Sequence, residues 1–173
     1  MSVLGIRLLG DPVLREMCEP VETIDDAIRQ LIEDLTETMY AADGIGLAAP
    51  QVGVPVRVFV YDVRDEELGT GALINPEIVE RQGTSKEEEG CLSIPGLSEP
   101  IERSERIAVR ALDASGEEVT FEADGMLSRC IQHERDHLDG VLFIDHLSPL
   151  KRRLLLRKWE KQERAAKESG AVL

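Results

Sequence analysis

The sequence predicts an α+β fold, in which antiparallel strands pack around a central helix and further helices lie near both ends of the chain. Three observations predict it: an amphipathic pattern at 25–40, a series of short β-branched segments between about 55 and 121, and two helical patterns that follow them. No internal repeat or flexible linker interrupts the 173 residues. We therefore expect residues 1–173 to form one domain.

Two helices are expected in the N-terminal part. Asp11-Pro12 offers a cap and a first-turn proline, which predicts a short helix ending near Met17. An amphipathic helix from Asp25 to Tyr40 follows, because its apolar residues recur every three or four positions. These are Ile28, Leu31, Ile32, Leu35 and Met39. The next stretch, "AADGIGLAAPQVG", predicts a loop that is too apolar for an ordinary solvated connection.

The strand-rich region contains "VRVFVYDV" and "ALINPEIVE", which are short and rich in β-branched residues. "RIAVRALDASGEEVTFEA" predicts a hairpin that turns at Ser115-Gly116. "DGMLSRCIQHERDHLDG" then predicts a helix closed by Gly140. Ser148-Pro149 opens a C-terminal helix at about 148–168 by the same cap-then-proline rule. Its expected apolar seam is Leu150, Leu154, Leu155 and Trp159.

Composition narrows the class of protein. The formal net charge of −14 argues against binding nucleic acid or an anionic membrane over most of the surface. Three cysteines are an odd number in a chain too large to need disulfides, and no targeting or membrane-spanning segment is apparent. We expect a cytoplasmic protein with reduced thiols and no membrane partner.

The segment "IQHERDHLDG" carries two histidines four positions apart. On a helix, His133 and His137 lie on the same face, with β-carbons about 5–6 Å apart, so they could hold one metal ion. Glu134 follows the first histidine, and the His-Glu-x-x-His pattern is typical of metal-assisted hydrolysis. The alternative is a pair of histidines that pack or cap near a helix end.

A hydrolytic metal site needs a third protein ligand and one open position. Downstream, Glu160 and Glu163 lie in a basic helix and His146 follows Asp145, so these candidates are weak. Upstream, "EEEGCLSIPG" contains Cys91, and a thiolate is a strong ligand for borderline or soft divalent metals. Taken alone, Cys91 fits a small buried hydrophobic residue better.

Three motifs occur in a fixed order: "GIGLAAPQ" at 44–51, "EGCLS" at 89–93 and "QHERDH" at 132–137. This set closely resembles the peptide deformylase family, metal-dependent amidases that remove the N-formyl group from new bacterial polypeptides. The resemblance covers residues from about 4 to 165. The stretch at 56–73 is too short for the long insertion of one subgroup, so the chain resembles the more compact bacterial subgroup. Two rivals remain: a metalloprotease, and a catalytically silent, metal-stabilised binding module that associates with the ribosome.

The resemblance implies roles for the site residues. The metal ligands would be Cys91, His133 and His137, with one ion per chain. Family members use ferrous iron, and nickel, cobalt or zinc can replace it. Metal-bound water would attack the formyl carbon, with Glu134 as general base and later general acid. Gln51, through its side-chain amide, and Leu92, through its backbone N–H, would stabilise the oxyanion.

The resemblance also implies an N-formyl-methionyl peptide as substrate, and methionine requires an apolar, adaptable pocket. The matching positions are Ile45, Met126, Cys130 and the ring of His133. Gly46 would allow the substrate to approach the backbone closely, since glycine has no β-carbon in the way. Arg129 stands where family members commonly carry an aliphatic residue. Its stem would line the pocket with its head in water, or its head would reach the backbone or carboxylate of the peptide.

Two charged features leave alternatives open. Asp136 points away from the metal face and pairs with Arg103 or belongs to a solvated surface pair. Between Lys151 and Glu168 there are eight Lys/Arg and three Glu. This basic helix either packs on the body with a solvated charged face or docks to ribosomal RNA near the peptide exit, as the resemblance implies.

Overall fold

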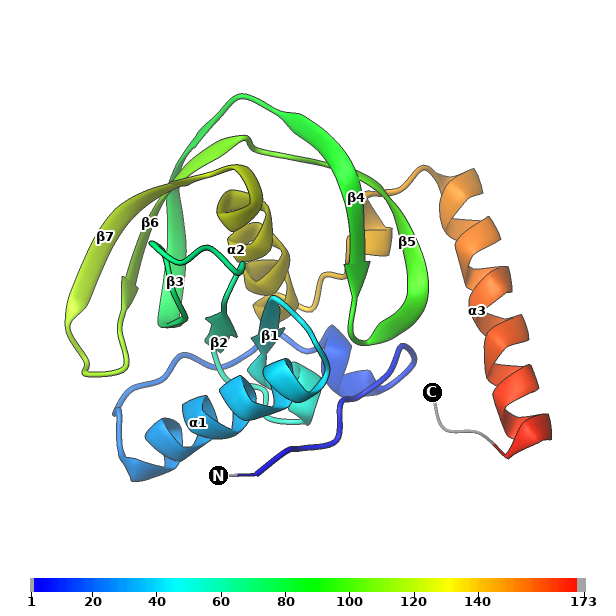
Figure 1. The fold of residues 1–173 in the computed structure, drawn as a ribbon, viewed down its shortest axis with the longest axis horizontal. Helices are drawn as coiled ribbons and strands as arrows, with labels where there is room; N and C mark the ends of the chain where they lie inside the picture. The colour runs from blue at the N-terminus through cyan, green and yellow to red at the C-terminus, as the bar shows by residue number, and fades with distance from the viewer. Residues whose placement is uncertain (1, 171–173) are drawn as a thin grey trace.

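A computed structural model describes residues 2–170 and confirms the α+β class (Figure 1). Within these residues, three short 3-10 helices, η1 to η3, accompany three α-helices and seven strands. In chain order the elements are η1 (Pro12–Arg15), α1 (Asp26–Ala41), β1 (Gly46–Ala48), η2 (Ala49–Val52), β2 (Val58–Tyr61), β3 (Gly71–Gln82), β4 (Ser85–Cys91), β5 (Ile94–Arg103), β6 (Arg106–Leu112), β7 (Glu118–Asp124), α2 (Gly125–Leu138), η3 (Phe143–His146) and α3 (Pro149–Ser169).

The strands form two antiparallel sheets with α2 between them (Figure 1). The larger sheet has the order β1-β2-β3-β6-β7, and β4 pairs only with β5. Leu127, Ile131 and Leu138 of α2 pack in one buried cluster with Phe59 and Val109 of the larger sheet. The expected central helix is thus confirmed, and it lies between the five-stranded sheet and the β4–β5 hairpin.

Two N-terminal expectations need correction. The segment after Asp11 forms a single 3-10 turn that ends at Arg15, because the backbone is already extended at Glu16. The expected loop at 41–53 contains the edge strand β1 and the turn η2. From Leu47 to Val52 its residues are buried, and Gln51 Oε1 accepts a hydrogen bond of 2.9 Å from Ala48 N. Burial of both backbone and side chains explains why this segment is apolar.

The expected hairpin is confirmed, with β6 and β7 paired in register and Gly116 at a φ of 88° in the turn. The C-terminal helix is also confirmed, and the Ser148 side chain caps it by accepting from Lys151 N. Its expected apolar seam is only half right. Leu155 and Trp159 are buried against η3 and β5, whereas Leu150 and Leu154 are 62% and 47% exposed.

Among residues 2–170, no helix has both the length and the apolar character that a membrane crossing requires.

Candidate metal centre and active site

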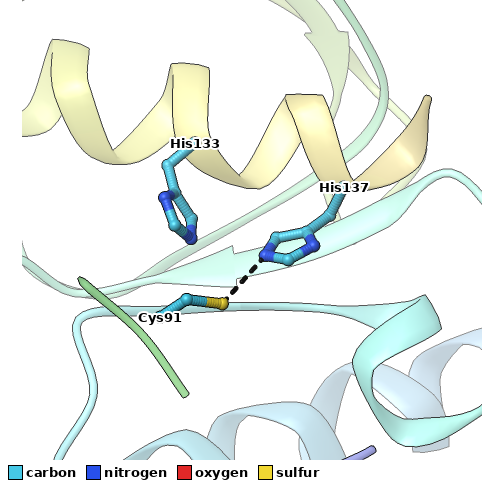
Figure 2. A group of neighbouring side chains, drawn as sticks. All are labelled: Cys91, His133 and His137. Atoms are coloured by element: carbon cyan, nitrogen blue, oxygen red, sulfur yellow. Dashed lines mark hydrogen bonds between the residues drawn. The ribbon is translucent and has the colours of Figure 1, made fainter. Parts of the chain in front are cut away.

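Cys91, His133 and His137 lie together in the interior of the protein (Figure 2). One potential ligand atom from each residue lies within 4.8 Å of the other two. Cys91 Sγ is 3.4 Å from His137 Nε2, and the two imidazole rings meet edge to face with their centroids 5.0 Å apart. Residues more than 40 positions apart in the sequence are therefore arranged as one cluster.

Local structure explains this arrangement. The histidines project from consecutive turns of α2, so both face β4. Cys91 ends β4, next to an irregularity in its pairing with β5. Ser93 N donates to Cys91 Sγ over 3.4 Å in the turn between these strands. The turn thus places Cys91 Sγ on the side of the hairpin that faces α2.

The donor set fits a divalent metal ion. A four-coordinate ion with ligand bonds of about 2.0–2.3 Å needs donor atoms roughly 3.5 Å apart, and the sulfur and His137 Nε2 already meet that spacing. His133 Nδ1 is 2.6 Å from Glu89 Oε2, which leaves Nε2 for an ion. Burial lowers the pKa of His137 well below its ordinary value, which favours the neutral ring that metals bind.

Glu89 is the main residue of the site that sequence reasoning missed. Its carboxylate accepts hydrogen bonds from Arg103 Nε at 3.1 Å and from Arg103 Nη2 at 2.6 Å, besides its contact with His133. Burial acts against ionisation, but the hydrogen bonds from His133 and Arg103 hold the pKa of Glu89 well below its ordinary value. The run "EEEG" resembles a solvated face, and only the alternation along β4 toward Cys91 distinguishes Glu89 from its neighbours.

The expected pairing of Asp136 with Arg103 is confirmed, with Nη1 and Oδ2 2.6 Å apart. His146 Nε2 lies 2.9 Å from the same Asp136 oxygen. His146 is thus outside the cluster of potential ligands, as are Glu160 and Glu163 on α3. This leaves Cys91 as the third member of the cluster in the described part of the chain.

Glu134 lies beside the three potential ligands and is 4% exposed. Its Oε2 atom is 4.0 Å from His133 Nε2, and its buried Oε1 atom has no hydrogen-bond partner within residues 2–170. Burial raises the pKa of Glu134 to about 7. A buried carboxyl with one free oxygen beside a metal site is suited to exchange a proton with a small bound molecule.

Gln51 enters the site from η2 and is 1% exposed. Its Nε2 atom donates to Ser93 Oγ at 3.1 Å and to Cys91 Sγ at 3.6 Å. Because Ala48 N holds Oε1, the amide group has a fixed orientation. Ser93 is a second residue that sequence reasoning missed, although it lies within the "EGCLS" motif.

A cavity of about 570 Å³ opens beside this cluster. Cys130 forms part of its wall, with Sγ 3.4 Å from the carbonyl oxygen of Ile45, and burial raises the pKa of this thiol well above its ordinary value. Ile45 and Met126 are partly exposed at 38% and 51%. All the expected catalytic and substrate-binding positions line the cavity: Ile45, Gly46, Gln51, Leu92, Met126, Arg129, Cys130 and Glu134.

The expectation that the head of Arg129 lies in water is wrong. Its side chain is only 6% exposed, and the guanidinium contacts Glu89, Ser85 and Ile101 within the protein. Burial beside an anionic carboxylate explains the difference, since a buried charge needs a partner. The guanidinium is therefore held by the protein itself.

Comparisons with known proteins agree with this geometry. The family model described as polypeptide deformylase matches residues 3–153. A peptide deformylase from Alkalilimnicola ehrlichii is 54% identical over 162 residues, which cover 93% of this chain and 91% of that protein. A peptide deformylase structure from Legionella pneumophila superposes with a TM-score of 0.90 at 43% identity, covering 96% of this chain and 98% of that one.

A second structure, the peptide deformylase of Ehrlichia chaffeensis in complex with actinonin, has a TM-score of 0.89 and 46% identity. It covers 95% of this chain and 99% of its own. Sequence match, fold and the clustered motif residues therefore agree, and the chain belongs to the polypeptide deformylase family.

Proposed function

We propose that this protein is a metal-dependent amidohydrolase that removes the N-formyl group from the formyl-methionine of newly made polypeptides and releases formate. The main supporting observation is the cluster of Cys91, His133 and His137 beside the buried Glu134, at the wall of a largely apolar cavity. Family membership supports the reaction and the general class of substrate.

We assign Cys91, His133 and His137 as metal ligands. A divalent ion held by these residues would supply a nucleophile at neutral pH, because such ions lower the pKa of water from 15.7 toward about 7. Glu134 would accept a proton from the attacking water and return it to the departing amine. That amine leaves poorly unless it is protonated. In this proposal the carboxyl group of Glu134 both accepts the proton from water and donates it to the amine.

Oxyanion stabilisation falls to two donors in this proposal. Gln51 Nε2 already points to the cluster, because Ala48 N and Ser93 Oγ orient its amide. Leu92 would contribute its backbone N–H from the turn that follows Cys91. Removal of one such donor typically costs about 2.7–4 kcal/mol of barrier. The formyl-methionyl side chain would lie along Ile45, Gly46, Met126, Cys130 and the stem of Arg129.

We propose ferrous iron as the native metal, with one ion per chain and with nickel, cobalt or zinc as substitutes. A donor set of one thiolate and two imidazoles suits each of these metals. Because the donor set does not distinguish these metals, metal content is compared after anaerobic and aerobic purification. Iron that is present after anaerobic purification and lost after aerobic purification is the expected result.

The decisive experiment measures formate release from formyl-Met-Ala-Ser by anaerobically purified, iron-loaded protein. Formate production is the expected result, and cleavage of an unformylated peptide would instead support the metalloprotease. A folded, fully metallated protein that releases no formate would support the catalytically silent module. The presence of both Glu134 and Gln51 beside the cluster argues against the catalytically silent module.

We further propose that residues 1–173 act as one domain in the cytoplasm and that α3 contacts the ribosome. The basic residues between Lys151 and Lys167 and the exposed Leu150 and Leu154 support a polyanionic partner with some apolar surface. Co-sedimentation with ribosomes at low salt, abolished by Arg153→Glu with Arg157→Glu, is the expected result. Unchanged co-sedimentation of this variant would contradict the ribosome contact.

A further inference from the structure

Arg129 makes four hydrogen bonds that tie α2 to both strands of the β4–β5 hairpin. Its Nη1 atom donates to Glu89 Oε1 at 3.2 Å and to the carbonyl oxygen of Ile101 at 2.7 Å. Its Nη2 atom donates to the carbonyl oxygen and the hydroxyl of Ser85, at 3.0 and 3.1 Å. One side chain therefore contacts Ser85 at the start of β4, Glu89 further along β4 and Ile101 near the end of β5.

These ties matter because the hairpin is not paired with the larger sheet. The metal cluster draws Cys91 from the hairpin and both histidines from α2, so its spacing depends on how these two elements are held. Other contacts hold the end of the hairpin near β6. Arg103 bonds to Asp136, and Gln132 bonds to the backbone of Ser104. Arg129, by contrast, donates a hydrogen bond from α2 to the backbone of β4 itself.

Arg129 also completes the surroundings of the Glu89 carboxylate. Arg103 lies on β5, in the same hairpin as Glu89, so their bidentate pair fixes the carboxylate within the hairpin. Arg129 approaches Oε1 from α2, the helix that carries His133. The other oxygen, Oε2, is 2.6 Å from His133 Nδ1. The orientation of the imidazole is thus set by a carboxylate that is held from two sides.

We propose that Arg129 is a positioning residue for the metal centre. Through Glu89 it orients the ring of His133, and through Ser85 and Ile101 it sets the separation of Cys91 from the two histidines. Its guanidinium does not select the side chain of the substrate, because it is bound within the protein, and the stem keeps its proposed place at the cavity wall. This inference rests on the proposed role of the three residues as metal ligands.

Two variants and one control test it. Arg129→Met keeps an unbranched apolar side chain at the cavity wall but removes all four hydrogen bonds. Arg129→Lys keeps the charge but has one nitrogen, which cannot replace both ends of the guanidinium. Arg81→Met is the matched control: Arg81 Nη1 bonds to Gln132 of the same helix at 3.2 Å, and Arg81 does not touch Glu89.

The first readout is independent of activity. Cobalt-loaded protein is titrated with a chelator while the visible absorption of the Co2+ centre is followed. The second readout is kcat and KM for formyl-Met-Ala-Ser and formyl-Ala-Ala-Ser. Arg129→Met is expected to weaken Co2+ retention roughly 10-fold, the lower end of the range for outer-shell partners, and to alter the spectrum. We expect kcat to fall to a similar extent, KM to stay within about twofold, and the preference for methionine over alanine to be unchanged.

Arg129→Lys should lie between Arg129→Met and the native protein, and Arg81→Met should match the native protein. Native Co2+ retention and spectrum in Arg129→Met would overturn the proposal. An altered methionine preference with native retention would make Arg129 a selectivity residue instead. If Arg129→Met does not fold, Arg129→Lys decides, and native behaviour of that variant refutes the role. A native protein that binds Co2+ but releases no formate would contradict the proposed function while leaving this test intact.

Discussion

Gly46 is the position where a single methyl group should do most damage to the site. A Cβ atom at this residue would lie 2.6 Å from Glu134 Oε2 and 2.9 Å from both Cδ and Cγ of Glu134. Gly46 is not among the glycines with positive φ, so the backbone itself tolerates alanine. The predicted effect of Gly46→Ala is therefore steric, and it falls on the carboxyl group that we assign as general base.

The size of the effect follows from these distances. To reach an ordinary contact of about 3.4 Å, Oε2 must retreat by about 0.8 Å from its present place. Turning the carboxylate of Glu134 alone would not relieve the contact, because Cδ and Cγ would also lie 2.9 Å from the added Cβ atom. Misplacement of a reacting group by about 1 Å can cost about 100-fold in rate, or about 2.7 kcal/mol of activation free energy. Overpacking should also lower stability by about 1–3 kcal/mol.

The assay is formate release by metal-loaded Gly46→Ala, with metal content and thermal unfolding measured on the same sample. Gly5→Ala is the control, because a Cβ atom there would meet nothing within 4 Å. We expect kcat to fall by about 100-fold at unchanged metal content. A folded, metallated Gly46→Ala protein with native kcat would refute both the steric argument and the placement of Glu134.

Three further predictions follow from the same structure. Glu134→Gln keeps the shape of the side chain but cannot accept a proton from water, so kcat should drop by about 10²–10⁴-fold while metal content stays native. Loss of the metal in this variant would show that Glu134 helps to hold the ion. A chelator should abolish formate release and lower the unfolding temperature, and Ni2+ or Co2+ should restore both, because an ion bound only to the folded state stabilises it. Asp145→Asn tests a charge contact at the base of α3: burial opposes ionisation of Asp145, but hydrogen bonds from Arg15 and Leu142 N lower its pKa. A lowered folded-state pKa gives stability that is present above the unfolded pKa of about 3.9 and is lost as pH falls through the folded value. The variant should therefore be less stable by about 1 kcal/mol at pH 7 and nearly equal to the native protein near pH 2; an equal difference at both pH values would exclude the charge contact.

The local part of the site could be predicted from the sequence, since helical spacing alone places His133 and His137 on one face. Cys91 required its motif, because nothing in its neighbours shows that a turn after β4 aims the sulfur at α2. Glu89 and Ser93 were missed, and the head of Arg129 was misplaced, for a related reason. The contacts of Glu89 and Arg129 depend on how the β4–β5 hairpin lies against α2, and the contact of Ser93 with Gln51 depends on how the turn after β4 lies against η2. No local pattern encodes either geometry.

The seam of α3 shows the same limit on a smaller scale. Helical periodicity groups Leu150, Leu154, Leu155 and Trp159, yet only the last two are buried. Leu150 and Leu154 lie four residues apart along one side of α3, and Leu155 and Trp159 lie four residues apart along the adjacent side, which packs on η3 and β5. Periodicity groups the apolar residues of a helix, whereas the width of the stripe that is covered is a tertiary property.

The position of Trp159 also makes the protein its own optical probe. It is the single tryptophan in the sequence, and it is 4% exposed beneath α3, on a cluster with Phe143 and Ile94. Intrinsic emission excited at the red edge of tryptophan absorption therefore reports on the docking of α3 alone. A red shift that precedes the loss of far-ultraviolet circular dichroism on heating would identify detachment of this helix as a separate, earlier event.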